Sequence, residues 1–423
     1  MHHLMNDDKA HEVAAVKSIQ KKLLGKRLSY REIYNLMDEI CRHKLSDILT
    51  TYFVASSFTK GFSPDELYYF TKAMVETGNK LNFKGIVADK HSTGGVAGTR
   101  TTLIIVPIIA AAGFKIPKIS SRAITTPAGT ADVMEVLAKV EFTVPQVEKI
   151  VNEVGGCIVW NGKLGIAPAD DILIRIEEPL SFEAFDKIIV SVMAKKVAAS
   201  TTHLIIDLPV GKTMKIRHYS DAEKIAQKFK DIAEKFHMKI VVDINETLEP
   251  AAYGVGPALE AQDALNVLEQ KKGRSLALEA KALKLSGKLL NICFKDAKIN
   301  KNGEDEVKRI LASGEAMKKF RQIIKAQGGN DQIGVDNFKI KGHHKDIKAE
   351  KSGTIKDIDN YNLNSITKIL GAPHDKYAGI YLLKKLDEKV TKNESLFTFY
   401  ATDTYKIKEA EITLNNFPIY KIE

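Results

Sequence analysis

Cysteine is scarce in this sequence of 423 residues, and only Cys41, Cys157 and Cys293 occur. They form no CxxC pair, and their odd number gives no even disulfide framework. A reduced intracellular protein is the simplest interpretation, so we expect a cytoplasmic location. We expect the three thiols to be small core residues and assign none of them a catalytic role.

Long hydrophobic runs are also absent. The longest candidate, residues 103–113, is shorter than the roughly 18–20 residues that a membrane span needs, and it contains Pro107. The N-terminal apolar residues recur at helical spacing with lysines among them, which excludes a signal peptide. We therefore expect no membrane association.

Aromatic residues make up only 7% of the chain, while the formal net charge is +10. A basic protein with few aromatics is a poor candidate for stacking nucleic-acid bases, and its lysines are spread along the sequence. Most of this charge is expected to solvate helix surfaces, with an anionic small molecule as the remaining functional interpretation. The only paired histidines in the folded region, His343 and His344, are a poor zinc signal.

Short β-branched runs alternate with helical stretches after an all-helical start, which predicts an α/β fold. A strand at 85–89 leads through a glycine-rich loop into an apolar helix at 102–113. Further strands are expected at 157–160, 203–208 and 239–244, and further helices at 145–154, 179–199, 220–236, 258–269 and 303–326. Residues 327–331 look like a linker, and 335–423 read as an α+β unit with a strand at 396–400.

The glycine-rich loop carries groups suited to holding phosphate. Lys90 offers a full positive charge, and Ser92 and Thr102 offer hydroxyl donors around Gly94, Gly95 and Gly98. Glycines allow close backbone approach to an anion, and the following helix adds its positive end. The spacing is neither a Walker loop nor a dinucleotide fingerprint. A tight turn with a surface lysine is the alternative.

A second hydroxyl-rich segment runs from Ser120 to Thr130 and also opens a helix. Thr130 could be a plain N-cap, and Arg122 could be a structural ion-pair partner. Two such loops, each ahead of a helix, favour an anion site between them.

The two segments read DKHSTGG from Asp89 and KIPKISSRAITTPAGTADVMEV from Lys115. They resemble the thymidine phosphorylase superfamily, most of all its branch of AMP phosphorylases and type 2 thymidine phosphorylases. The resemblance covers nearly the whole chain, through APADD at 167–171, SVMAKK at 191–196, VGPALEA at 255–261, GAPH at 371–374 and AGI at 378–380.

The resemblance implies a helical domain, an α/β domain with the active site in the cleft between the two, and a small C-terminal α+β domain. Together with the sequence pattern it predicts a helical domain at 10–80 that is joined by 172–202. The α/β phosphate-binding domain is expected at 83–171 and 203–328, and the C-terminal domain at 335–423.

The resemblance also assigns roles to individual residues. It implies a phosphate site made of Lys90, Ser92, Thr102, Ser120 and Thr130. His91 is placed beside the sugar and base, and Glu183 falls at the position of the proton donor. The implied nucleotide-binding residues are Gly95, Ser121, Arg122, Ala123, Ile124, Thr125, Thr126, Ser191, Lys195 and Lys215.

The implied reaction is phosphorolysis of a nucleoside 5′-monophosphate, with AMP preferred, to free base and ribose 1,5-bisphosphate. The alternative is a thymidine or pyrimidine nucleoside phosphorylase that yields a sugar 1-phosphate. Pyrimidine-specific members carry an arginine where this sequence has Ile176 or Glu177, although Arg175 is adjacent. This departure favours the AMP branch.

Two more interpretations of the sequence stay open, namely a phosphoribosyltransferase that needs magnesium, and a basic nucleic-acid-binding protein. The proton donor of the AMP branch is usually Asp, whereas this chain has Glu183, and Asp170 or Asp171 is the alternative donor. We expect no metal or organic cofactor, with inorganic phosphate as a substrate. The chain starts almost directly at the helical domain, so we expect a homodimer.

Overall fold

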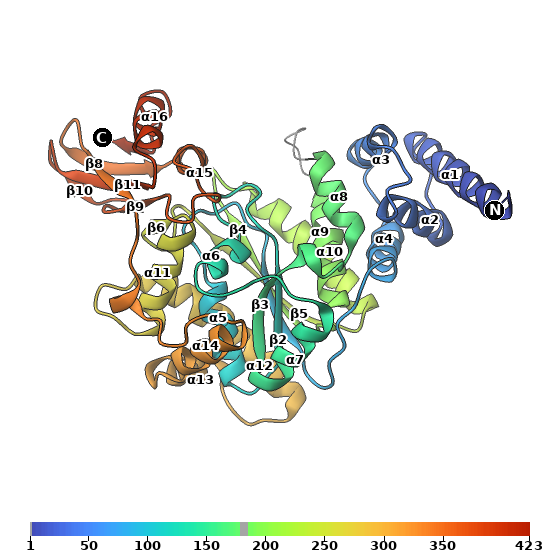
Figure 1. The fold of residues 1–423 in the computed structure, drawn as a ribbon, viewed down its shortest axis with the longest axis horizontal. Helices are drawn as coiled ribbons and strands as arrows, with labels where there is room; N and C mark the ends of the chain where they lie inside the picture. Colours follow the sequence, from blue (N-terminus) through green and yellow to red (C-terminus); the bar gives the residue numbers. More distant parts are fainter. Residues whose placement is uncertain (1, 178–184) are drawn as a thin grey trace. The chain divides into compact units, whose positions relative to one another are not determined.

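The computed structural model describes residues 2–177 and 185–423, and the chain divides into two compact units (Figure 1). The helical unit comprises Met1–Lys84, Asn161–Thr202 and Glu223–Ile240. The α/β unit comprises Gly85–Trp160, His203–Ala222 and Val241–Glu423. Each unit is described by itself.

The helical unit is built from α-helices. Its helices are α1 (His2–Leu23), α2 (Tyr30–Cys41), α3 (Asp47–Lys60), α4 (Pro64–Glu76), α8 (Pro168–Glu177), α9 (Phe185–Ala198) and most of α10 (Tyr219–Lys235). The expected all-helical character of 10–80 is confirmed.

Local sequence signals set where these helices begin. Ser29 and Glu32 form a capping box at the start of α2, and Ser63 with Glu66 forms another at α4, whose first residue is Pro64. Glu66 is buried, and its carboxylate also lies 2.9 Å from the ammonium of buried Lys22. The cap of α4 thus serves as the counter-charge for a lysine of α1.

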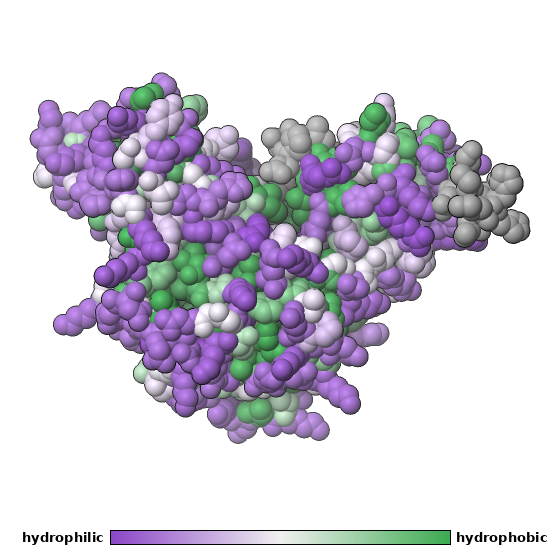
Figure 2. All heavy atoms as spheres, viewed as in Figure 1, coloured by the Kyte–Doolittle hydropathy of each residue, from purple (hydrophilic) through white to green (hydrophobic). Residues whose placement is uncertain are grey.

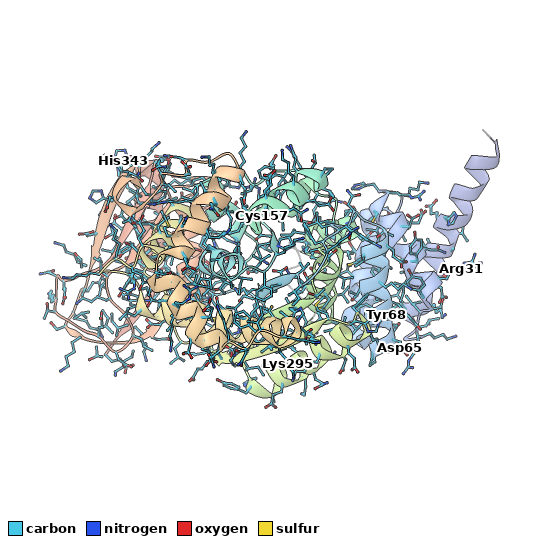
Figure 3. All side chains as sticks on the ribbon, turned by 90° about the horizontal axis from the view of Figure 1, so that it is seen from below. Arg31, Asp65, Tyr68, Cys157, Lys295 and His343 are labelled. Carbon is cyan, nitrogen blue, oxygen red and sulfur yellow. The ribbon has the colours of Figure 1, made fainter. Side chains whose placement is uncertain are left out.

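The domain boundaries differ from the expected ones in two places, because 161–171 and 223–240 belong to the helical unit. The side chain of Asn79 donates to the carbonyl of Leu164 at 2.8 Å, which ties the first segment. Lys235 of α10 pairs with Asp65 at 3.0 Å and lies over the ring of Tyr68. Figure 3 shows Asp65 and Tyr68 together on α4.

The α/β unit contains parallel strands, as predicted. Strand β1 (Ala88–Ser92) pairs in parallel with β4 (His203–Val210), which neighbours β5 (Lys239–Glu246). Strand β2 (Ile116–Ser120) pairs in parallel with β3 (Gly156–Trp160), and a bridge between Val87 and Lys115 joins the two groups. The expected strand at 85–89 is shifted, so that Asp89 to Ser92 lie on the strand and the loop begins at Thr93.

Helices cover this sheet and bury the main core. They are α5 (Thr102–Ala111), α6 (Thr130–Glu135), α7 (Val144–Val154), α11 (Pro257–Leu268), α12 (Leu276–Ala297), α13 (Gly303–Ala312) and α14 (Glu315–Ala326). Helix α5 is buried on all sides, as its apolar sequence predicts. The single helix expected at 303–326 is wrong, because Gly314 adopts a left-handed φ of 78° and separates α13 from α14.

The C-terminal region forms two antiparallel sheets with orders β6-β9-β11-β7 and β10-β8-β12. Their strands are β6 (Gly254–Val255), β7 (His343–Lys348), β8 (Gly353–Ile358), β9 (Gly379–Leu382), β10 (Lys389–Val390), β11 (Ser395–Ala401) and β12 (Tyr420–Ile422). Two helices, α15 (Asn360–Ile369) and α16 (Thr404–Leu414), complete it. Figure 2 shows a mostly hydrophilic surface over this region.

The sequence suggested a separate domain from residue 335 onward, but this region belongs to the same compact unit as the parallel sheet. Strand β6 precedes α11 in the chain yet pairs with β9, and Ala97 and Val255 lie in the C-terminal hydrophobic core. The expected linker at 327–331 is also anchored. Gln327 is fully buried, and its side chain bonds to both backbone groups of Ile158.

Within residues 2–177 and 185–423, no helix combines the length and apolar character that crossing a bilayer requires.

Candidate active site

The first loop follows β1 and turns into α5. Gly94, Gly95 and Gly98 all have positive φ values, of 82°, 84° and 53°. Residues with side chains seldom adopt this left-handed conformation, so the glycines are required by the turn itself. A Cβ on Gly95 would also lie 3.1 Å from Cγ of Lys215, one of the predicted nucleotide-binding residues. The structure therefore brings Gly95 and Lys215 together.

The backbone of Lys90 is bound by a second lysine, Lys118. The ammonium of buried Lys118 donates to the Lys90 carbonyl at 2.9 Å and lies 3.6 Å from the carboxylate of Asp89. The Lys90 side chain is itself only 4% exposed. Burial lowers the pKa of Lys90 to about 8, against the attraction of Asp207, because a buried ammonium loses hydration. A bound anion would add to the attraction of Asp207 and favour the charged form of Lys90.

Asp207, at the middle of β4, organises the polar side chains next to Lys90. Its carboxylate accepts from Asn245 at 2.7 Å, lies 3.2 Å from the ammonium of Lys281, and bonds to the Ser92 hydroxyl. Burial opposes its ionisation, but Lys281 and Lys90 hold the pKa of Asp207 below its usual range. Predicted phosphate residues Lys90 and Ser92 thus share a buried carboxylate, whereas His91 on the same strand is half-buried.

The second loop follows β2 and is shaped by its own hydroxyl groups. The Ser120 hydroxyl donates to the carbonyl of Ser121 at 3.2 Å, and the Thr126 hydroxyl donates to Ala128 at 2.9 Å. Helix α6 begins at Thr130, but its N-cap is Gly129. The N-cap interpretation of Thr130 is therefore wrong, and its hydroxyl is available for another role.

Arg122 is engaged in ion pairs within the same loop. Its guanidinium contacts Asp132 at 3.1 Å and Glu135 at 2.7 Å, and it lies over the ring of Trp160. These bonds raise the pKa of Arg122 and lower that of Glu135 to about 2. The structure thus supplies the ion pairs that one interpretation anticipated, and nucleotide binding by Arg122 stays a prediction. Of the remaining loop residues, Ala123 donates its N–H to Asp132, while Ile124 and Thr125 are half-buried or exposed.

Arg100 connects the two loops, and the sequence reasoning missed it. Its guanidinium donates to the Thr130 hydroxyl at 3.0 Å and to the Ala128 carbonyl at 2.6 Å. It also pairs with buried Glu260 at 2.7 Å. Because the Thr130 oxygen already accepts from Arg100, its own proton can be donated to an anion. An arginine directly before Thr101 and Thr102 was the available signal.

Ser191 and Lys195 lie in the helical unit, one turn apart on α9. Both contact buried Asp170, the hydroxyl of Ser191 at 2.8 Å and the ammonium of Lys195 at 2.5 Å. Burial opposes the charge on both groups. Even so, Lys195 holds the pKa of Asp170 below its usual range, and Asp170 raises the pKa of Lys195. The structure places the two residues around one carboxylate, while their binding of the nucleotide stays a prediction.

Glu183, the predicted proton donor, lies outside the described residues. Of the two alternative donors, Asp170 forms an ion pair with Lys195 and is therefore ionised. Burial of its carboxyl group and then the charge of Asp170 raise the pKa of Asp171, although the residue as a whole is exposed to solvent. Asp171 is therefore the better acid of the pair.

Metal-binding groups do not stand out in the described parts of the chain, where no cluster of three or more His, Cys, Asp or Glu residues could hold an ion. Cys41, Cys157 and Cys293 are free thiols, and Cys157 lies on β3 inside the α/β unit (Figure 3). Burial raises the pKa of Cys293 to about 12, which disfavours the reactive thiolate.

Family models match three consecutive parts of the chain. The glycosyl transferase family a/b domain matches residues 84–317, and the helical bundle domain of that family matches residues 16–78. The chain belongs to this glycosyl transferase family. The C-terminal domain of pyrimidine nucleoside phosphorylases matches residues 354–418. The protein is therefore an enzyme of the pentosyl-transferring phosphorylase type, with the helical, α/β and C-terminal parts that the resemblance implied.

Curated relatives named AMP phosphorylase match most of the chain. The protein of Thermofilum pendens is 41% identical over 404 residues, which are 95% of this chain and 77% of that protein. AMP phosphorylase 1 of Archaeoglobus fulgidus is 38% identical over 94% of this chain and 78% of its own length. These matches confirm the resemblance to the AMP phosphorylase branch.

Two solved structures share the fold. Anthranilate phosphoribosyltransferase from Thermus thermophilus superposes with a TM-score of 0.61 at 17% identity, covering 74% of this chain and 99% of that one. The Saccharomyces cerevisiae enzyme gives 0.58 at 16% identity, covering 74% and 98%. At these identities the likeness concerns the fold alone.

Proposed function

We propose that this enzyme cleaves nucleoside 5′-monophosphates by phosphorolysis, with AMP as the preferred substrate. The observation that carries the proposal is the identity of about 40% to AMP phosphorylases across nearly the whole chain. The two loops, which Arg100 joins by hydrogen bonds, also support it. They supply two cations, Lys90 and Arg100, and the hydroxyl donor of Thr130 for binding an anion.

The reaction requires an attacking phosphate and a proton for the departing base. A phosphate oxygen forms a bond to the anomeric carbon while the bond from that carbon to the base nitrogen breaks. The electron pair of the broken bond stays on the base, which takes up a proton from an acid. The products are free base and ribose 1,5-bisphosphate. Phosphate is a substrate, and the proposal includes no metal or organic cofactor.

The assembly and location of the enzyme belong to the same proposal. We expect a homodimer in the cytoplasm with no nucleic-acid or membrane partner. A cleft between the helical and α/β units, closing over both substrates, stays a prediction from the resemblance.

Base release in phosphate buffer tests the function, with AMP, CMP, adenosine, thymidine and uridine assayed side by side. We expect adenine from AMP and little from adenosine. Thymine or uracil release without AMP cleavage would move the enzyme to the nucleoside phosphorylases. Strict magnesium dependence with diphosphate, and no reaction with phosphate alone, would indicate a phosphoribosyltransferase.

Glu183→Gln should lower kcat for AMP by about 100- to 10,000-fold while KM changes little, because the amide cannot protonate the leaving base. Glu183→Asp is the matched control, since it keeps a carboxyl group at the position. Steady-state kinetics across pH 5–9 would separate the two variants. Full activity in Glu183→Gln would exclude this residue as the acid, and Asp171→Asn would then be the next variant.

A further inference from the structure

A helix of the C-terminal region contacts the first loop of the candidate active site. Asn360, at the start of α15, is only 2% exposed. Its amide nitrogen donates to the carbonyl of Gly95 at 2.5 Å, and its amide oxygen accepts the N–H of Ala97 at 2.9 Å. One side chain therefore closes the turn formed by Gly95, Val96 and Ala97 with a pair of hydrogen bonds.

The same helix face reaches both loops. Asn364, one turn further along, points its amide nitrogen toward the Gly95 carbonyl at 3.4 Å. Lys368, another turn along, donates to the carbonyl of Ile124 in the second loop at 2.8 Å. Residues four apart lie on one side of an α-helix, so these three side chains form a row. This row, Asn360, Asn364 and Lys368, contacts both nucleotide-site loops.

Apolar packing fixes the row against the first loop. Ala97 is 1% exposed and shares its hydrophobic cluster with Leu363 and Ile366 of α15. The loop is thus part of the C-terminal core on one side. Moving α15 would expose this apolar surface as well as break the amide contacts.

The contacts decide which backbone donors of the first loop point toward a ligand. The N–H of Ala97 is taken by Asn360. The peptide between Gly95 and Val96 is planar and trans, so the Val96 N–H lies opposite the Gly95 carbonyl that Asn360 holds. Asn360 therefore turns the Val96 N–H away from α15.

We propose that α15 is a positioning element for the nucleotide, with Asn360 setting the orientation of the first loop and Lys368 supporting the second. The C-terminal region then contributes to substrate affinity through the two loops. This inference rests on the proposed function, because it assumes that Gly95 and its neighbours bind the nucleotide.

The test compares Asn360→Asp with Asn362→Ala in the full-length enzyme. The aspartate keeps the side-chain shape but turns an acceptor toward the Gly95 carbonyl, so the loop loses its orientation. We expect KM for AMP to rise about tenfold, which corresponds to the loss of one buried hydrogen bond, while kcat changes less. Asn362 lies on the same helix but bonds to the carbonyl of Pro418 at 2.9 Å, so its variant should leave KM unchanged.

Thermal unfolding of both variants shows whether the helix remains folded. Equal KM values in Asn360→Asp and Asn362→Ala, at similar melting temperatures, would overturn the inference. Hydrogen exchange of residues 94–97 without substrate separates this inference from the proposed function. We expect faster exchange in Asn360→Asp only, even if the wild-type enzyme releases no base from AMP. Equal exchange in the two variants would also overturn it.

Discussion

Lys90→Gln should lower kcat/KM for phosphate by about 100- to 1,000-fold, because a buried cation aimed at the reacting anion is lost. The chain offers a matched control in Lys90→Arg, which keeps the charge. Melting temperatures should not fall in Lys90→Gln, since removing a poorly hydrated ammonium leaves Asp207 with Lys281 as its partner. Unchanged phosphate kinetics in Lys90→Gln would exclude this residue from the phosphate site.

The same residue predicts how phosphate affinity depends on pH. Because the pKa of Lys90 is lowered to about 8, about half of the ammonium is present at pH 8, nearly all of it one pH unit lower, and progressively less above pH 8. We therefore expect KM for phosphate to rise as pH passes through about 8, toward tenfold per pH unit above it, where phosphate itself no longer changes charge. Lys90→Arg should remove this rise, since a guanidinium stays charged throughout. A rise that persists in Lys90→Arg would assign the titration to another group.

Arg100→Met should destabilise the enzyme by about 3–5 kcal/mol, because it leaves Glu260 buried without its counter-charge. Glu260 is 1% exposed, and burial raises its pKa even with Arg100 present. The variant should also raise KM for phosphate, since the Thr130 hydroxyl loses the donor that orients it. Urea unfolding and phosphate kinetics measure the two effects separately.

Two further variants separate the structural from the positioning role of Arg100. Arg309→Met removes a half-exposed arginine with two glutamate partners, and it should lower stability far less than Arg100→Met, because solvent screens these ion pairs. Arg100→Met combined with Glu260→Gln should recover stability but not phosphate affinity. Recovery of both would show that Arg100 acts only by holding the fold together.

Local signals in the sequence predicted much of the fold. The Ser29 and Glu32 pair marks one helix start, Ser63 followed by Pro64 marks another, and the β-branched run before the glycine-rich loop marks a strand, because all three signals depend on neighbouring residues. The sequence analysis did not predict strand β2. Proline and lysine are uncommon in buried strands, and Pro117 and Lys118 interrupt its apolar pattern. Lys118 is recognisable only from its contacts with Lys90 and Asp89, which are distant in sequence.

For the candidate site, the sequence predicted the two loops but not the contacts that join them. Loop residues such as Lys90 and Gly95 stand out through their composition. Arg100 and Asn360 do not, because their roles depend on partners 30 to 265 residues away. Contacts across such distances follow from the tertiary fold, which residue spacing does not encode.

The central claim is that phosphate itself attacks the sugar of AMP. The most direct measurement incubates AMP with radiolabelled phosphate, follows adenine release, and locates the label in the product. We expect one labelled ribose 1,5-bisphosphate for each adenine, and no adenine release when phosphate is omitted. Adenine release without phosphate, or an unlabelled sugar product, would contradict the account and indicate hydrolysis.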